Sequence, residues 1–176
     1  LQYADHIVFN SIHQLKAFGP RGKQAGKSLG LRVNPECSTQ EGHAIYDPCA
    51  PGSRMGVTRN VWDQEMDEAT LPLPDGIHFH TLCEQNSDDL KTTLAAVEEK
   101  FGDILPEMKW INMGGGHHIT RPDYDLGTLE DCIRHAQQSW GVNVYLEPGE
   151  AVALNAGYLA SRVLDVVENG GVRIAI

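Results

Sequence analysis

The sequence has few basic residues and no long apolar run. Lysine and arginine number 14 against 24 aspartates and glutamates, and the net charge is -10. A chain of this charge repels nucleic-acid backbones and anionic lipids, so we expect neither as a partner, whereas a small cationic ligand is compatible with it. No stretch is apolar for long enough to cross a bilayer, and no basic region followed by an apolar core marks a secretion signal.

The chain also lacks paired cysteine motifs. Its four cysteines form no C-x-x-C pair, and their spacing fits neither a zinc site nor a disulfide framework. We therefore expect reduced thiols, a cytoplasmic protein and no bound metal. The 176 residues are enough for one domain with its own core. Because Leu1 is not a methionine and both ends fall within patterned sequence, we expect a chain truncated at both ends.

Apolar runs of strand length recur along the chain. They are His6–Phe9, Leu29–Val33, Gly76–Phe79, Lys109–Met113 and Val142–Leu146. Between the later runs, residues 87–101 and 124–140 carry apolar side chains at spacings of three and four, and Ser87 is the expected N-cap of the first helix. This alternation predicts an α/β fold with a parallel sheet covered by helices, either a barrel or an open doubly wound sheet. Five strands are too few to close an eight-stranded barrel.

The last twenty residues predict a different structure. Val163–Val167 and Val172–Ile176 are β-type runs separated by Asn169-Gly170-Gly171, which is typical of a hairpin turn. We therefore predict that residues 1–156 form the α/β part, and that residues 157–176 lead into a second, antiparallel β domain.

Two of the predicted strands end in sequences suited to anion or acid chemistry, and active sites of α/β folds lie at strand ends. Gly114, Gly115 and Gly116 follow the fourth run, where free backbone N–H groups could hold a phosphate; a tight turn that needs positive φ accounts for them equally well. Glu147 ends the fifth run and is followed by a rigid Pro148-Gly149 turn.

The third run ends in two histidines on one face of the strand. His78 and His80 alternate with a period of two, so their side chains point the same way. They could bind a metal as in barrel hydrolases, with His117 or His118 as a further ligand. Alternatively one of them stacks on a planar cofactor ring, and a structural histidine remains an open interpretation of either one alone.

Taken together, these strand ends resemble the fold-type III pyridoxal-phosphate (PLP) decarboxylases, in particular the carboxynorspermidine (carboxyspermidine) decarboxylase branch. The strings that carry this resemblance are Leu31–Pro35 (LRVNP), His78–Glu84 (HFHTLCE), Met113–Thr120 (MGGGHHIT) and Glu147–Ala151 (EPGEA). The resemblance covers essentially the whole chain. It implies an alanine-racemase-like (β/α)8 TIM-type barrel, of which residues 1–156 are the central and C-terminal part, followed by a β domain that is mostly absent.

The resemblance also implies a cofactor, a reaction and site residues. The cofactor is PLP, and the reaction is decarboxylation of carboxynorspermidine or carboxyspermidine to norspermidine or spermidine in polyamine biosynthesis. His80 would stack on the PLP ring, and Glu147 would face the pyridine nitrogen, where a carboxylate keeps that nitrogen protonated. These two are the catalytic candidates. The phosphate would be held by Gly114, Gly115 and Gly116, with Gly149 nearby. Arg32, at the end of the second strand, could add positive charge there, although a surface arginine is an equally open interpretation.

This chain departs from the family pattern at two places. Related basic-amino-acid decarboxylases carry a basic residue after Glu-Pro-Gly, where this chain has Glu150. His117 and His118 stand where the relatives have small or apolar residues. We expect Glu150 to face ammonium groups of the substrate or a second polar partner, although a solvated loop acid explains it equally well, and we expect His117 and His118 to line the substrate end of the site. The Schiff-base lysine is expected upstream of Leu1, because no lysine here follows an apolar strand. The isolated fragment is therefore expected to be inactive.

Other functions remain open from the sequence. A diaminopimelate- or ornithine-type PLP decarboxylase is the nearest alternative, and a metal-dependent barrel hydrolase or a non-catalytic PLP-binding protein are less favoured. The resemblance implies a homodimer for the full-length protein. The sequence does not separate carboxynorspermidine from carboxyspermidine as the preferred substrate.

Overall fold

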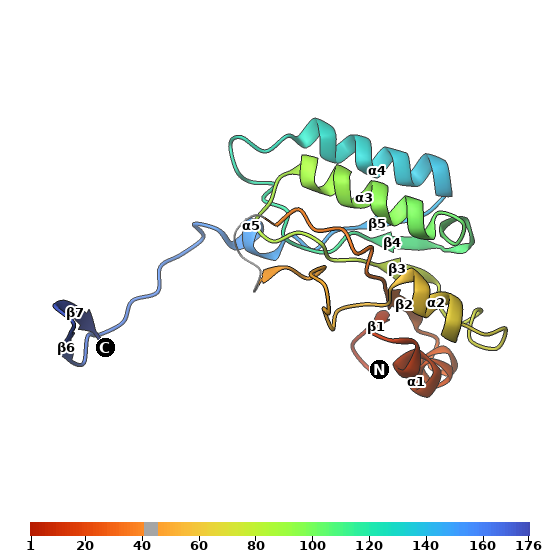
Figure 1. Ribbon diagram of the computed structural model, residues 1–176, viewed down its shortest axis with the longest axis horizontal. Helices are drawn as coiled ribbons and strands as arrows, with labels where there is room; N and C mark the ends of the chain where they lie inside the picture. Colours follow the sequence, from red (N-terminus) through yellow and green to blue (C-terminus); the bar gives the residue numbers. More distant parts are fainter. Residues whose placement is uncertain (41–45) are drawn as a thin grey trace.

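The structure is a computed structural model that describes residues 1–40 and 46–176. Its main body is a curved parallel sheet whose strands follow one another in chain order, β1-β2-β3-β4-β5 (Figure 1). The strands are β1 His6–Phe9, β2 Ser28–Arg32, β3 Gly76–His78, β4 Trp110–Asn112 and β5 Asn143–Tyr145. All five predicted strands are therefore confirmed, with ends that differ by one residue at most.

Helices connect the successive strands. They are α1 Ile12–Gln24, α2 Arg59–Glu65, α3 Ser87–Phe101 and α4 Leu126–Trp140, with a short 3-10 turn, η2 Leu105–Glu107, before β4. Parallel strands joined in sequential order by right-handed crossovers place every connecting helix on the same side of the sheet. This winding is that of a barrel and not of a doubly wound sheet, in which the strand order reverses. Within the described residues, no helix has the length and apolar character needed to cross a membrane.

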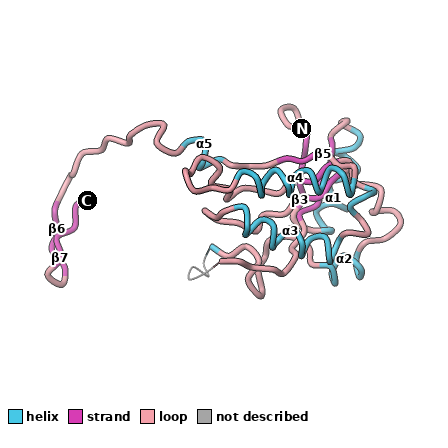
Figure 2. The backbone as a smooth tube through the Cα atoms, turned by 90° about the horizontal axis from the view of Figure 1, so that it is seen from above, coloured by secondary structure: helices cyan, strands magenta, loops and turns pink. Residues whose placement is uncertain are grey.

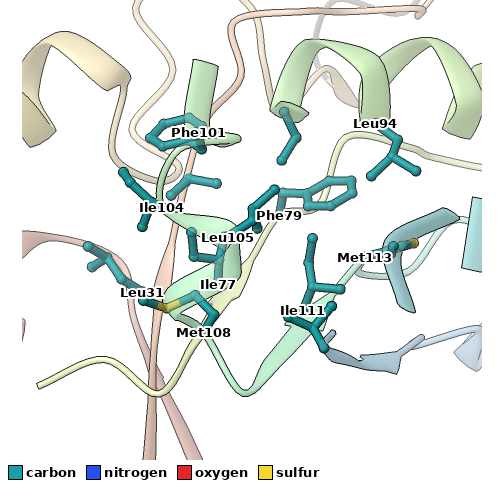
Figure 3. Close-up of a cluster of buried hydrophobic side chains, with 14 of the residues drawn as sticks. Leu31, Ile77, Phe79, Leu94, Phe101, Ile104, Leu105, Met108, Ile111 and Met113 are labelled. Atoms are coloured by element: carbon teal, nitrogen blue, oxygen red, sulfur yellow. The ribbon is translucent and has the colours of Figure 1, made fainter. Parts of the chain in front are cut away.

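The core lies between the sheet and these helices (Figure 3). The register aligns Leu31, Ile77 and Ile111 on three neighbouring strands, and all three side chains are fully buried. Phe79 and Phe101 pack against this row from the end of β3 and from α3. The helices thus cover the apolar face of the sheet, and the site lies on the opposite, concave face.

The Trp110 indole occupies the lower level of the concave face, in contact with the rings of His6 and Tyr145. Gly30, Gly76 and Trp110 are paired across β2, β3 and β4. A methyl group added to either glycine would collide with the Trp110 ring, so the indole lies directly on both strands. Its Nε1 donates a hydrogen bond of 2.8 Å to the Ser28 hydroxyl. Arg32, His78 and Asn112 form the next level on the same face, toward the carboxyl ends of the strands.

At the other end of the sheet, one carboxylate links the N-terminal ends of three strands. Asp75, just before β3, accepts hydrogen bonds from the Leu29 N–H at 2.9 Å, from Lys23 at 2.6 Å and from Lys109 at 2.8 Å. Its backbone N–H donates to the Leu29 carbonyl and its carbonyl accepts from the Lys109 N–H. Asp75 thereby joins the N-terminal ends of β2, β3 and β4.

The C-terminal residues leave the sheet. A short helix α5, Gly149–Ala153, follows β5, and an extended segment then leads to the antiparallel pair β6 Val166–Asn169 and β7 Val172–Ala175. Residues 152–176 are exposed throughout, and the hairpin lies well away from the sheet in both views (Figures 1 and 2). The predicted hairpin is confirmed, while the β domain that it would enter stays a prediction.

The start of α3 differs from the prediction. Ser87 is the first residue of the helix and not its N-cap, a position held by Asn86. The Ser87 hydroxyl instead donates a 2.7 Å hydrogen bond to the carbonyl of Asp125, the N-cap of α4. This residue therefore fastens the starts of α3 and α4 to each other.

Candidate functional site

The polar side chains at the carboxyl ends of the strands surround a cavity of 320 Å³. Its lining consists of Val8, Asn10, Arg32, His78, His80 and Glu147. A second, wider cavity of 620 Å³ adjoins it, and both are lined by Arg32 and His80. The strand ends therefore bring four of the predicted site positions to one place: Arg32, His80, the glycine turn and Glu147.

Glu147 is held in place by two neighbouring strands. Its Oε1 accepts a 2.8 Å hydrogen bond from Asn112 Nδ2, and its Oε2 lies 3.6 Å from Nε2 of His78. Its backbone N–H donates to the carbonyl of Gly114. The side chain is still 49% exposed, so this oriented carboxylate faces the cavity and is available to a ligand.

His78 lies beneath this carboxylate. Burial lowers the pKa of His78, although the nearby Glu147 carboxylate partly opposes that effect. The ring is consequently neutral near pH 7, and its buried Nδ1 has no hydrogen-bond partner within the described part of the chain.

His80 is oriented by the glycine turn. Its Nδ1 accepts a hydrogen bond of 3.3 Å from the N–H of Gly115, so in the neutral ring the proton is on Nε2. Burial, followed by the charge of Arg32, lowers the pKa of His80 and keeps the ring neutral. A neutral imidazole with fixed tautomer and orientation can pack against a planar group, as the sequence predicts.

The glycine turn is packed between the ends of β3 and β5. Gly114 has a φ of 71°, and a Cβ there would lie 2.5 Å from the Phe79 carbonyl oxygen. A Cβ on Gly115 would lie 2.7 Å from the carbonyl oxygen of Glu147. These close approaches explain why glycine is needed here. The N–H groups of Gly114 and Gly115 donate to Asn112 Oδ1 and His80 Nδ1, and that of Gly149 donates to the Glu147 carbonyl. Phosphate binding by this turn stays a prediction.

Arg32 supplies the positive charge at the edge of both cavities. Its Nη2 lies 3.4 Å from the carbonyl oxygen of His80, to which it donates. Burial lowers the pKa of Arg32, while Glu147 is among the groups that oppose this change. An arginine keeps its charge under such conditions.

The two adjacent histidines of the turn have different environments. His117 is buried, and its Nε2 donates to the carbonyl of Met113 at 3.2 Å. His118 is also buried, but its Nε2 points to the side chain of Glu150, with 3.6 Å between Nε2 and Oε2. His118 and not His117 thus lies beside Glu150. The predicted substrate role of His117 remains a prediction.

Sequence reasoning missed Asn112 and Asn10. The Asn112 side chain orients Glu147 and also accepts the N–H of Gly114. The sequence feature that could have identified Asn112 is its position at the end of its strand, which the register pairs with His78. Asn10 follows β1 and holds the loop over the wider cavity, by donating to the Arg54 carbonyl and accepting from the Gly56 N–H.

Comparisons with known proteins identify relatives of this chain. No protein-family model matches the chain. It is 42% identical over 164 residues to a carboxynorspermidine/carboxyspermidine decarboxylase of Campylobacter jejuni, covering 93% of this chain and 41% of the relative. It is 36% identical over 166 residues to a carboxyaminopropylagmatine decarboxylase of Synechocystis, covering 94% of this chain and 42% of that protein. The chain therefore spans about two fifths of the length of these relatives.

Solved structures lead to the same fold. A crystal structure of carboxynorspermidine decarboxylase from Campylobacter jejuni, in complex with norspermidine, matches with a TM-score of 0.76 and 41% identity, over 99% of this chain and 42% of that one. A diaminopimelate decarboxylase structure matches with a TM-score of 0.56 and 20% identity, over 97% of this chain and 42% of that one, which shows a common fold alone. The prediction of part of a TIM-type barrel is confirmed.

Proposed function

We propose, from the premise that this chain is homologous to a segment of the carboxynorspermidine/carboxyspermidine decarboxylases, that the protein containing it is a PLP-dependent decarboxylase of carboxylated polyamines. The observation that carries the proposal is the oriented carboxylate of Glu147. It lies at a strand end beside an imidazole of fixed tautomer, and it faces a cavity.

The residues present fit PLP. The 320 Å³ cavity falls in the size range of small-molecule sites, and its polar groups are few and convergent. A protonated pyridine nitrogen needs a carboxylate, which Glu147 offers with its position fixed by Asn112. A flat ring needs a flat neighbour that does not titrate, which the neutral imidazole of His80 offers. Arg32 adds the cationic charge that a phosphate-bearing ligand requires.

PLP, when bound, supplies the electron sink for the pair of electrons left as carbon dioxide departs. Glu147 would hold a proton at the pyridine nitrogen through a charge-assisted hydrogen bond. His78, neutral and buried below, does not compete for that proton. His80 would fix the tilt of the ring, and the buried Trp110 indole lies on Gly30 and Gly76 at the lower level of the same face. The lysine that attaches the cofactor would come from outside this chain.

The proposed substrates are carboxynorspermidine and carboxyspermidine. Their support is the activity named for two relatives, at 42% and 33% identity, and the acidic character of this chain. The Synechocystis relative acts on carboxyaminopropylagmatine by its name, so that compound is a third substrate to compare. The metal hydrolase has little support, because among described residues the one group of three possible metal ligands includes neither His78 nor His80. We further propose a cytoplasmic homodimer for the full-length protein.

The test is carried out with the full-length protein that contains this chain. We expect a PLP absorbance band that is removed by hydroxylamine, and release of carbon dioxide from the three carboxylated polyamines at far higher kcat/KM than from ornithine or diaminopimelate. Equal or better turnover of either simple amino acid would contradict the substrate assignment. A protein without the absorbance band, but with stoichiometric zinc, would contradict the reaction itself.

A further inference from the structure

His78 faces the oxygen of Glu147 that Asn112 does not bind. In the register, His78 at the end of β3 is the partner of Asn112 on β4, which is itself the partner of Tyr145 on β5. Glu147 follows Tyr145 by two positions, so its side chain lies on the same face, one level higher. Oε1 of this carboxylate accepts the 2.8 Å hydrogen bond from Asn112, and Oε2 lies 3.6 Å from Nε2 of His78.

The carboxylate decides which nitrogen of His78 carries the hydrogen. Burial lowers the pKa of His78 more than Glu147 raises it, and a neutral imidazole has hydrogen on one nitrogen only. A carboxylate oxygen only accepts, so a bare Nε2 would turn a lone pair toward it and be repelled. The hydrogen is therefore on Nε2. The distance of 3.6 Å is longer than a hydrogen bond, so the N–H dipole acts on Oε2 through space.

The other nitrogen of the His78 ring has no interaction to explain it. Nδ1 is closed to solvent and has no hydrogen-bond partner among the residues that the structure describes. A buried polar atom without a partner is unfavourable, and an apolar side chain of similar size would avoid this cost. Packing alone therefore does not account for an imidazole at this position, whereas the contact between Nε2 and Glu147 does.

Both neighbours of the Glu147 carboxylate are uncharged. In the ion pairs found within residues 1–40 and 46–176, Glu147 is paired with His78 and with no lysine or arginine. Arg32 acts on it from a greater distance. A cationic side chain in contact with the carboxylate would compete with a cationic ligand. Neutral donors orient Glu147 and leave its charge available.

We propose that His78 is a positioning residue for the decarboxylation and acts through Glu147. Its Nε2–H attracts Oε2 while the Asn112 amide binds Oε1, so the carboxylate is held toward the cavity that both His78 and Glu147 line. Because His78 is uncharged, the full negative charge of Glu147 stabilises the proton on the pyridine nitrogen of bound PLP. A carboxylate oriented in advance needs less reorganisation during the reaction. This inference rests on the proposed function.

The experiment compares His78→Gln with His78→Met in the full-length, PLP-loaded protein. The two replacements are unbranched and equal in length, but only the glutamine amide offers an N–H donor in the place of Nε2. We expect single-turnover decarboxylation to be about threefold to thirtyfold slower in His78→Met and within about twofold of the wild type in His78→Gln. The nitrogen resonance of isotope-labelled PLP should move toward the unprotonated form in His78→Met alone.

Urea unfolding of the same proteins is the control for a purely structural effect. His78→Met removes the unpaired Nδ1, so we expect it to be no less stable than the wild type. A slower reaction in a protein of full stability then reports on Glu147 and not on packing. If His78→Met does not fold, His78→Leu takes its place as the apolar variant. Equal rates and equal PLP resonances in the glutamine and apolar variants would overturn the positioning role.

Two further measurements need no bound cofactor. Long-range proton–nitrogen correlation spectra of the full-length apoprotein, assigned by the signal that His78→Gln removes, should show the hydrogen of His78 on Nε2; hydrogen on Nδ1 would overturn the inference. Crystal structures should show the same Glu147 orientation in the wild type and His78→Gln, and a rotated carboxylate in the apolar variant. If the full-length protein binds no PLP, the proposed function fails, and these two measurements still decide whether His78 orients Glu147.

Discussion

The side chains of Asn112 and Glu147 are joined by a 2.8 Å hydrogen bond at the ends of β4 and β5. Asn112 lies at the last position of its strand, and its own oxygen accepts the N–H of Gly114. One amide thereby sets the direction of the carboxylate and the start of the glycine turn together.

Glu147→Gln should keep PLP binding and lose much of the decarboxylation rate. Glutamine preserves the shape and can still hydrogen-bond, but it carries no charge to hold a proton on the pyridine nitrogen. Transition-state stabilisation should weaken by a few kcal/mol, which is about tenfold to a thousandfold in rate. Single-turnover decarboxylation, with PLP occupancy measured in parallel, checks this. A full rate at full occupancy would show that Glu147 is only a turn residue.

His80→Ala should alter the cofactor spectrum and turnover more than His78→Ala does. His80 lines both cavities and its ring is fixed by Gly115, whereas His78 is buried below Glu147. Absorbance and circular dichroism of the bound cofactor, together with kcat, distinguish the two variants. The roles of the two histidines are reversed if His78→Ala abolishes both signals while His80→Ala leaves them unchanged.

Gly114→Ala should destabilise the protein more than Gly26→Ala. Both glycines have a similar positive φ, 71° and 69°, so the backbone strain is matched. A Cβ at Gly26 meets nothing within 4 Å, whereas at Gly114 it would lie 2.8 Å from His80 Cα. We expect Gly26→Ala to cost about 1–2 kcal/mol and Gly114→Ala roughly 2–5 kcal/mol, with weakened PLP binding in the second variant alone. Equal costs in urea unfolding would contradict the close packing of this turn.

Asp75 should make the stability of the protein sensitive to acid. Burial raises the pKa of Asp75, but hydrogen bonds from Lys109, Lys23 and Leu29 outweigh it and lower the pKa to about 2. A pKa lower in the folded than in the unfolded state stabilises the fold above the unfolded value, and this contribution is lost as the pH falls from about 4 to about 2. It amounts to about 2 kcal/mol.

Asp75→Asn should therefore lower the free energy of unfolding by about 2 kcal/mol at pH 7 and remove this part of the pH dependence. Asp5→Asn, at an exposed residue near the same end of the sheet, is the control. Urea titrations at pH 7, 4 and 2.5 check the expectation. An unchanged acid dependence in Asp75→Asn would contradict it.

The parts of the fold that local patterns encode could be predicted, because each strand is a short apolar run and α3 and α4 have an uninterrupted helical period. The bounds of α1 could not be predicted, since Gly19, Pro20 and Gly22 lie within it and interrupt that period. Those glycines are tolerated because the Leu29 side chain packs against their backbone, a contact that is absent from the local sequence.

At the site, the strand-end residues could be predicted one at a time, but their partners could not. Asn112 and Glu147 are 35 positions apart and meet only through the register of β4 with β5. Likewise, Glu84 and His118 are neighbours only because Gln85 pairs with the turn after β4. Such contacts depend on tertiary structure, which no spacing along the chain specifies.

The indole of Trp110 fills the space that side chains at Gly30 and Gly76 would occupy. Substitutions at these three positions, on three neighbouring strands, therefore depend on one another. A larger residue at Gly30 or Gly76 is compatible with the fold only if a smaller residue has already replaced Trp110. A smaller residue at position 110 leaves a void unless a larger residue replaces one of the glycines. Single exchanges at any of the three should be selected against, while compensated exchanges are permitted. Related chains are therefore expected to change these positions together, by a path that passes through a less stable intermediate.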